Sequence, residues 1–119
     1  MVGRRDGGDD RRRAVVSTPR QGEVWWAQAE DKRRPVLIVT RDVAVPVLNR
    51  VIVAPVTRTV RDIPTEVSLG AAEGLPVDCA ASFDNLQPVS RHLLLERVGA
   101  LSGDRRREIC RALDALADC

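Results

Sequence analysis

The stretch DKRRPVLIVT, residues 31–40, decides how this chain folds, because it sets three cations directly before an apolar run. The run predicts a short strand over 35–40 that is buried on both faces. A strand of this kind needs partner strands on both sides, so the flanking segments should supply them. Taken on pattern alone, Lys32, Arg33 and Arg34 are more typical of a solvated loop that precedes a strand.

Segments on both sides of this run have the composition of further strands. They are rich in β-branched and aromatic residues or alternate between apolar and polar positions. Pro55 falls near the end of one of them and indicates a bulge or a sheet edge. The expected strands are 22–28, 50–57, 65–69, and one or two short strands within 78–89 that break near Asp84 and Asn85.

The connecting segments carry turn signals, and the clearest helix comes last. We expect 41–49 to be a connection with room for a helical turn, 58–64 to be a loop and 70–76 to be a turn, whereas 91–99 fits a helical turn and a strand equally. Ser102 is a suitable N-cap with Asp104 in the first turn. The apolar positions that follow at helical spacing are Ile109, Leu113, Leu116 and Ala117.

These elements predict a mainly β fold with α (α+β): a small curled antiparallel sheet or barrel with a C-terminal helix. The length of 119 residues suits one domain. Residues 1–20 are rich in Gly, Asp and Arg without hydrophobic period, so we expect a disordered leader there and a single domain over 21–119.

Composition excludes several classes of protein. No apolar run approaches the roughly 20 residues of a membrane helix, and the N-terminus lacks the apolar core of a secretory signal, so we expect a cytoplasmic protein without a membrane partner. Residues 1–20 hold six arginines and three aspartates, a net of +3, whereas the remaining 13 cations and 14 acidic residues give −1. Bulk charge therefore argues only weakly for a polyanionic partner.

The rarer side chains narrow the chemistry further. Cys79, Cys110 and Cys119 lack metal-ligand spacing, so the sequence predicts no metal site, and packing roles suit them better than catalysis. His92 is the single histidine, which excludes a pair of catalytic histidines in one chain. On a strand, Trp25 and Trp26 face opposite sides, so one should fill the core and the other should lie outside, where an interface is favoured over base stacking.

One pair of side chains at a strand end stands out. If 35–40 and 50–57 are antiparallel neighbours, the start of one lies near the end of the other, and Arg34 and Thr57 meet at one rim of the sheet. A guanidinium with a hydroxyl beside it suits a phosphate or a developing oxyanion. Pro35 should keep the preceding cations out of the strand ladder.

In order along the chain, the segments GEVWWAQ, RRPVLIVT, VIVAPVT, TEVSL, SFDNLQPV and a helix after RVGALS resemble the MazF/PemK family of toxins. The resemblance covers about residues 20–117. It implies an SH3-like, CcdB/MazF-type barrel of about five to seven antiparallel strands that acts as a homodimer. It also implies a metal-independent, sequence-specific endoribonuclease, an mRNA interferase without cofactor, that leaves 2′,3′-cyclic phosphate and 5′-hydroxyl ends.

The same resemblance assigns the site residues. Arg34, of the RP step, and Thr57, which closes the strand ending PVT, match the family's catalytic pair. Arg33 matches a supporting cation. The other expected RNA-binding residues are Arg58, Arg61, Asn85 and Gln87, and the candidates for the general base are Glu30 and Asp31 in the loop before the cations.

Two departures from the family pattern concern RNA. The loop before Arg33 is shorter than in many relatives, and many relatives carry Gln at the position of Asn85 and Arg at that of Gln87. Either difference would alter the RNA sequence that the protein prefers. Because some relatives act on structured RNA, tRNA and rRNA remain open as substrates beside mRNA.

The family implies one further partner and one competing function. A cognate antitoxin with a disordered acidic segment should bind the toxin, and the region of Arg33, Arg34, Arg58 and Arg61 is a suitable landing place for it. The same fold serves the CcdB-type gyrase poison, a binding protein without nuclease activity. That group relies on its C-terminal residues, whereas this chain ends in ALADC and retains Arg34 and Thr57.

Overall fold

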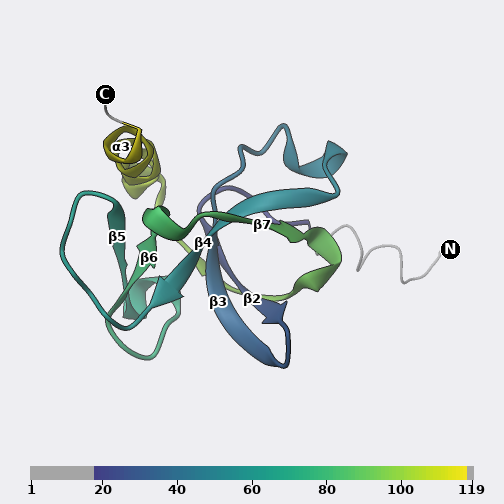
Figure 1. Cartoon of the computed structure of the whole chain (residues 1–119), viewed down its shortest axis with the longest axis horizontal. Coiled ribbons are helices and arrows are strands. Elements are labelled where there is room, and N and C mark those ends of the chain that lie inside the picture. Colours follow the sequence, from purple (N-terminus) through teal and green to yellow (C-terminus); the bar gives the residue numbers. More distant parts are fainter. Residues whose placement is uncertain (1–17, 118–119) are drawn as a thin grey trace, which may run out of the picture.

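Figure 1 shows a computed structural model of the chain, which describes residues 18–117. The predicted leader falls mostly on residues 1–17, and these lie outside the described residues, as does Cys119. The described end of that segment contacts the fold, because Pro19 is buried and the Arg20 N–H donates to Glu23 Oε1 over 2.9 Å. The strands and the helix are β2 (Glu23–Ala29), β3 (Lys32–Ile38), β4 (Arg50–Thr57), β5 (Glu66–Leu69), β6 (Cys79–Ser82), β7 (Gln87–Ser90), β8 (Leu94–Ala100) and α3 (Arg107–Leu116).

The strands form one curled antiparallel sheet in the order β5-β6-β4-β3-β2-β8, and β7 also pairs with β4. β4 is the strand that joins the two halves, as Figure 1 shows. Its residues Arg50–Val53 pair with β7, and its last two pair with β6. Pro55 lies between these two stretches, where its missing N–H removes no bond from either ladder. The predicted curled antiparallel sheet with a C-terminal helix is confirmed.

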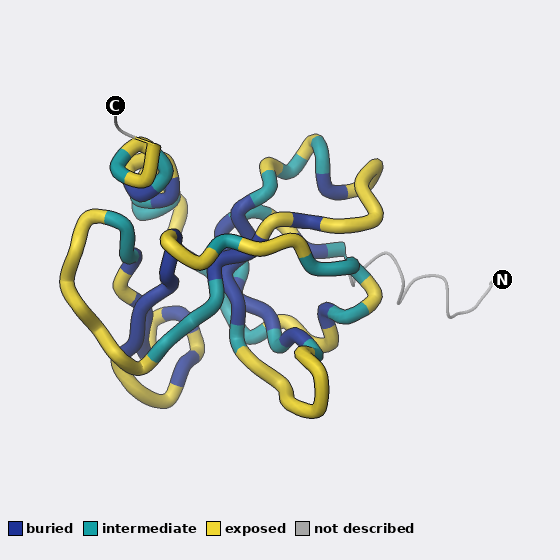
Figure 2. Tube along the Cα trace, in the orientation of Figure 1, coloured by how far each residue is buried: buried dark blue, intermediate teal, exposed yellow. Residues whose placement is uncertain are grey.

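The apolar part of β3, Val36 to Ile38, is buried on both faces, as the sequence predicts, whereas Lys32, Arg33 and Arg34 are exposed. Leu37 belongs to a cluster that packs toward β5, β6 and α3, whereas Val36 and Ile38 belong to a second cluster with Trp25 and Val51. Figure 2 shows the buried segments of the strands gathered at the centre, with the exposed stretches in the loops. The two clusters fix β3 in the middle of the molecule, so its first residues project from a rigid support.

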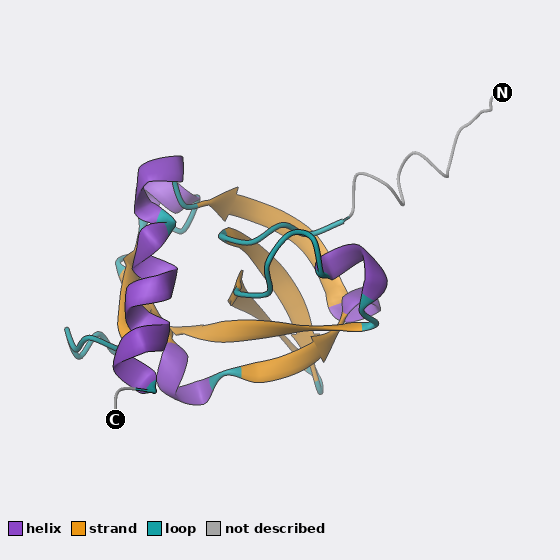
Figure 3. Ribbon diagram, turned by 90° about the horizontal axis from the view of Figure 1, so that it is seen from above, coloured by secondary structure: helices purple, strands orange, loops and turns teal. Residues whose placement is uncertain are grey.

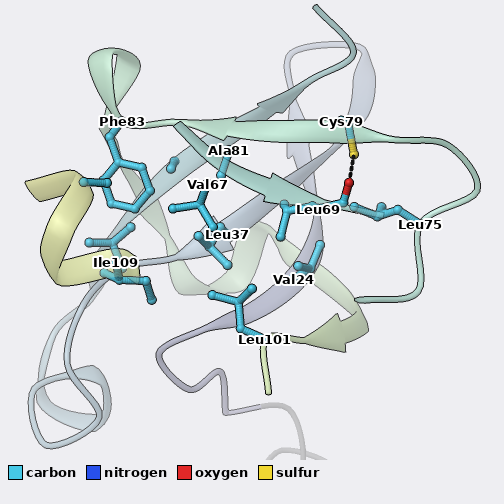
Figure 4. Packing of buried hydrophobic residues seen from close by; sticks show 13 residues of the cluster. Val24, Leu37, Val67, Leu69, Leu75, Cys79, Ala81, Phe83, Leu101 and Ile109 are labelled. Atoms are coloured by element: carbon cyan, nitrogen blue, oxygen red, sulfur yellow. Dashed lines mark hydrogen bonds between the residues drawn. The ribbon is translucent and has the colours of Figure 1, made fainter. Parts of the chain in front are cut away.

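The helix closes the first of these clusters. Figure 3 shows α3 against one side of the sheet, and Figure 4 shows Phe83 beside Ile109 in the core. Ser102 precedes a 3-10 turn, η5 (Gly103–Arg105), and the α-helix begins only at Arg107. Ile109 and Ala112 are its buried residues, whereas Leu116 is 41% exposed because the core cluster ends at Leu113. Leu116 therefore lies in the helix at the predicted spacing but at its exposed end, and Ala117 is the exposed C-cap.

The expected connections are largely confirmed. Residues 41–49 contain a helical turn, η1 (Val45–Val47), and β5 alternates between buried and exposed positions. The segment 78–89 is broken by η3 (Phe83–Asn85) into two strands. The ambiguous stretch contains both alternatives in sequence, a 3-10 turn, η4 (Arg91–Leu93), and then β8. The turn expected over 70–76 holds η2 (Ala71–Glu73).

One prediction about the cations is wrong. Pro35 does not exclude them from the ladder, since Arg34 pairs with Ala27 and Arg33 with Gln28 in a hairpin closed by the two residues Glu30 and Asp31. The reason is that β4 pairs with β3 only from Val36 onward. At Pro35, β3 has one neighbour, so a residue without an N–H is tolerated there.

Candidate functional site

The register of β3 and β4 determines which side chains share a face. Val36 lies opposite Pro55 and Leu37 opposite Ala54 in an antiparallel pair. The pairing of the two strands ends at Val36 and Pro55, and the same register continued for two residues would bring Arg34 opposite Thr57. Neighbouring residues on a strand point to opposite faces, so Arg33 and Arg58 meet on the other face. The meeting of Arg34 and Thr57 that the sequence predicts therefore follows from the observed pairing.

Both residues line one open cavity of about 450 Å³, called here the Arg34 cavity. It brings together five of the residues that the sequence singles out, and three that it does not. The five are Arg34, Thr57, Arg61, Asn85 and Gln87, and the three are Pro55, Val56 and Ser82. The lining residues come from β3, β4, the loop after β4, β6, η3 and β7, so the cavity depends on several strands that are far apart in the sequence.

Two of the polar side chains around the Arg34 cavity, those of Thr57 and Asn85, form hydrogen bonds with neighbouring residues. Thr57 Oγ1 accepts the N–H of Thr59 over 3.0 Å, which leaves the hydroxyl proton available for a ligand. Asn85 Nδ2 donates to the buried Ser82 Oγ over 2.9 Å. Within residues 18–117 the guanidinium of Arg34 has no ion pair or hydrogen bond, so its N–H donors remain free for an anion.

Ser82 is the site residue that sequence reasoning missed. It is 4% exposed and ends β6, where it orients the Asn85 amide. A serine in the run CAAS reads as an ordinary small strand residue. Only the expected end of the strand, before the turn that begins at Phe83, could have indicated that the Ser82 side chain lies at a strand end.

The opposite face carries a second hollow, called here the Arg33 groove, of about 300 Å³. Arg33 lies over the ring of Trp26, with 5.5 Å from Cζ to the ring centroid, and its Nη2 is 3.3 Å from Glu96 Oε1. Trp25 is buried and Trp26 is half-buried, as the alternation predicts. The groove joins two arginines to apolar surface, and its lining residues are Trp26, Arg33, Pro35, Val56, Arg58, Leu75, Pro76, Val77 and Cys79.

Cys79 belongs to the packing of this groove. Its side chain is 4% exposed, and Sγ lies 3.8 Å from the Leu69 carbonyl oxygen, as Figure 4 shows. Burial raises the pKa of the Cys79 thiol above its ordinary value, and the negative charges of Asp78 and Glu73 raise it further. A thiol held in its protonated form is a poor nucleophile, which agrees with the structural role expected from the sequence.

The remaining sequence-predicted residues lie away from the Arg34 cavity. Glu30 and Asp31 form the exposed turn of the β2–β3 hairpin and line neither hollow. His92 is exposed on η4. The four arginines expected to form one binding surface for the antitoxin lie in two places. Arg34 and Arg61 line the cavity, whereas Arg33 and Arg58 line the groove.

Residues 18–117 contain no cluster of three or more His, Cys, Asp or Glu side chains placed to hold a metal ion. They also contain no helix long and apolar enough to cross a membrane.

Comparison with known proteins gives consistent matches. Residues 20–117 match the family model of the PemK-like, MazF-like toxins of type II toxin–antitoxin systems. The chain is 41% identical over 107 residues to "Probable endoribonuclease MazF5" of Mycobacterium tuberculosis, which covers 88% of this chain and 98% of that protein. The solved structure of "Mycobacterium tuberculosis toxin MazF-mt6" superposes with a TM-score of 0.75 at 38% identity and covers 81% of this chain and 96% of that one.

A further structure extends the likeness in fold. It is titled "Endoribonuclease in complex with its cognate antitoxin from Mycobacterial species", and it has a TM-score of 0.72 at 24% identity, covering 82% of this chain and 93% of that one.

Proposed function

The chain belongs to the PemK-like, MazF-like toxins of type II toxin–antitoxin systems, and on that premise we propose that it is an endoribonuclease with its reaction centre in the Arg34 cavity. The observation that carries this proposal is that Arg34 and Thr57, a guanidinium and a hydroxyl, line the same polar hollow. The endoribonuclease names of its relatives support the activity.

RNA supplies its own nucleophile, so the protein needs no covalent group. The 2′-hydroxyl gives up its proton to a base as its oxygen attacks the adjacent phosphorus, the bond from phosphorus to the 5′ oxygen breaks, and that oxygen takes a proton from water. The products then carry a 2′,3′-cyclic phosphate and a 5′-hydroxyl. The protein must hold the strand in line and stabilise the extra negative charge of the phosphorane. Arg34 can bind two phosphate oxygens at once, and Thr57 can donate its hydroxyl proton to a third.

The 2′-proton needs an acceptor other than Arg34. Arg34 stays protonated and cannot act as the base. Glu30 and Asp31 remain candidates, although about three residues of strand, roughly 10 Å, separate their turn from Arg34. If either accepts the 2′-proton, its amide variant, Glu30→Gln or Asp31→Asn, should lose the acidic limb of the pH–rate profile. Two unchanged profiles would exclude both carboxylates.

The other polar residues of the cavity fit a single-stranded substrate. Arg61 can hold a flanking phosphate, whereas the amides of Asn85 and Gln87 can donate to and accept from base edges. Arg33 and Arg58, on the other face, would contact only a strand that passes around the ends of β3 and β4. We propose mRNA as substrate, with tRNA or rRNA as alternatives, and an RNA substrate implies action in the cytoplasm.

The decisive experiment incubates purified protein with a long RNA in EDTA and maps the new ends. We expect cleavage at a short recurrent sequence, with 5′-hydroxyl and cyclic phosphate termini. Inhibition of DNA gyrase without RNA cleavage would favour the gyrase-binding alternative instead. Absence of both activities, in protein that arrests no growth when expressed, would contradict a toxin function.

We propose that a cognate antitoxin binds through an acidic segment with apolar anchors, and that the Arg33 groove receives it. The groove offers two guanidiniums beside Trp26, Leu75 and Val77, which complements such a segment. Because the groove and the Arg34 cavity meet at the ends of β3 and β4, the bound segment should also obstruct RNA. Competition between RNA and antitoxin tests this, and a ternary complex would contradict it.

We also propose a homodimer. Val43 and Val47, at 78% and 79% exposure, leave apolar side chains on the surface of the β3–β4 connection, which suits burial against a second copy. Sedimentation equilibrium should give a mass of two chains, and a Val47→Asp variant should shift it toward one.

A further inference from the structure

Glu66 is a buried carboxylate that the proposed reaction does not use. It begins β5, opposite Ser82 of β6, and its side chain is 4% exposed. Its Oε2 is buried without a hydrogen-bond partner. Burying a charged group with one oxygen unsatisfied is costly, so a carboxylate retained there needs a reason.

The other oxygen of Glu66 holds the loop that follows β4. Oε1 accepts two successive backbone N–H groups, that of Arg61 over 2.9 Å and that of Asp62 over 3.1 Å. Asp62 has a left-handed backbone with φ of 57°, which a residue other than glycine adopts at a cost. Two successive N–H groups converging on one oxygen form an anion-binding nest, here filled by the chain's own carboxylate.

Besides these two bonds, the Glu66 backbone N–H donates to the Ile63 carbonyl oxygen over 3.0 Å. Residues 58–64 are exposed, and in Figure 2 they form an exposed arc between β4 and β5. At its ends the Thr59 N–H donates to Thr57 Oγ1, and Thr65 Oγ1 donates to Asp84 Oδ2 over 2.7 Å. Between these ends, the middle of the loop is held by Glu66.

Arg61 is the residue of this loop that lines the Arg34 cavity, and Glu66 binds its backbone. Its backbone N–H is bound by Glu66, and its Nη1 lies 3.9 Å from the unsatisfied Oε2 of the same carboxylate. That separation is too long for a hydrogen bond but close enough for charge attraction. This attraction draws the guanidinium toward Glu66, beside the Arg34 cavity that Arg61 lines, and without a hydrogen bond in that contact its donors can still bind an anion.

We propose that Glu66 is the positioning residue for Arg61, and that it acts on the substrate only through the placement of that guanidinium over the cavity. The inference rests on the proposed RNA cleavage, because substrate affinity is its readout. It adds to the site a carboxylate that touches neither the substrate nor Arg34.

A double-mutant cycle in the full chain tests the inference. With a defined RNA oligonucleotide cut by the wild type, Arg61→Ala and Glu66→Ala should each raise KM roughly ten- to hundredfold, with a smaller change in kcat. The double variant should be no worse than either single one. Glu66→Gln, whose amide oxygen can accept both N–H groups, should restore most of the affinity.

Glu73 provides the matched control. Its side chain is also 4% exposed, it accepts the Gly70 N–H over 2.7 Å, and it pairs with Arg105 over 2.9 Å away from the Arg34 cavity. Glu73→Ala should lower the melting temperature without changing KM where the protein is folded. If Glu66→Ala does not fold, the comparison of Glu66→Gln with Glu66→Asp decides, since the shorter carboxylate retains the charge but withdraws from the nest and should bind RNA more weakly.

The outcomes separate the two proposals. A wild-type protein that cuts no RNA contradicts the proposed function. Cleavage by the wild type, together with an unchanged KM in folded Glu66 variants, overturns the positioning role alone. Additive losses in the double variant also overturn it, because Glu66 would then act independently of Arg61.

Discussion

Arg33 and Arg34 are adjacent in sequence, yet the fold delivers them to different surfaces. Arg34 faces a polar cavity with Thr57, whereas Arg33 lies over Trp26 beside an apolar groove. The residue type is the same, so the difference in chemistry comes entirely from the alternation of the strand and the neighbours on each face. One surface offers free donors for a phosphate, and the other offers charge combined with apolar area for a peptide.

The largest effect should come from the variant that tests this division directly. Arg34→Ala should lower the cleavage rate about a hundred- to a thousandfold, because it removes the main charge that stabilises the phosphorane. Arg33→Ala is the matched control and should change the rate less than about fivefold. Both should retain the circular dichroism spectrum of the wild type. Equal losses in the two variants would show that the faces are not functionally distinct.

The reverse experiment addresses the groove. Arg33→Glu and Arg58→Glu should each weaken binding of the cognate antitoxin roughly ten- to hundredfold, because charge reversal opposes an acidic segment, while RNA cleavage persists. Affinity is measured by titration calorimetry and cleavage in the same preparation. An antitoxin that binds both variants as tightly as the wild type would remove the groove from its footprint.

Thr57 should matter less than Arg34. Thr57→Val keeps the shape but removes the hydroxyl, and it should lower the cleavage rate about tenfold or more by the loss of one hydrogen bond to a charged oxygen. Thr57→Ser should restore the rate, since the hydroxyl returns. Thr59 is a nearby threonine that contributes its N–H to Thr57 Oγ1 and does not line the cavity. Thr59→Val should therefore cleave normally, and a loss in that variant would point to loop shape rather than to the hydroxyl.

The sequence predicted the central strand and the polar pair well, for physical reasons that are local. The apolar run after Pro35 requires burial on both faces, and an antiparallel pairing of it with 50–57 in a register close to the observed one brings Arg34 near Thr57. That Arg33 and Arg34 face opposite sides also follows from strand alternation, but only if both residues belong to the strand. Pro35 made the sequence suggest otherwise. A proline is tolerated in a strand where only one neighbouring strand is present, and the sequence does not reveal where that is the case.

Other features could not be predicted because they depend on distant partners. The role of Glu66 depends on a loop conformation that no residue pattern specifies, since two N–H groups converge on one oxygen only in the folded chain. The exposure of Leu116 depends on where the core beneath α3 ends, whereas helical spacing identifies a face without its length. Ser82 is indistinguishable in sequence from any small residue of a buried strand.

The smallest expected effect uses Cys79 to report on the groove without altering activity. With Cys110 and Cys119 replaced by serine, Cys79 is the remaining thiol, and its side chain is 4% exposed. Burial and neighbouring carboxylates raise the pKa of Cys79, so less of the reactive thiolate is present near neutral pH than for an exposed cysteine. Labelling by a disulfide reagent should therefore be slow at pH 7 and should accelerate as the pH rises toward that raised pKa.

Bound ligands should change this labelling rate differently. An antitoxin segment in the groove should slow the labelling a further few-fold at fixed pH, whereas an RNA confined to the Arg34 cavity should leave the rate unchanged. If both ligands slow the labelling equally, the groove and the cavity are not separate binding surfaces. If neither slows it, the antitoxin segment binds outside the groove.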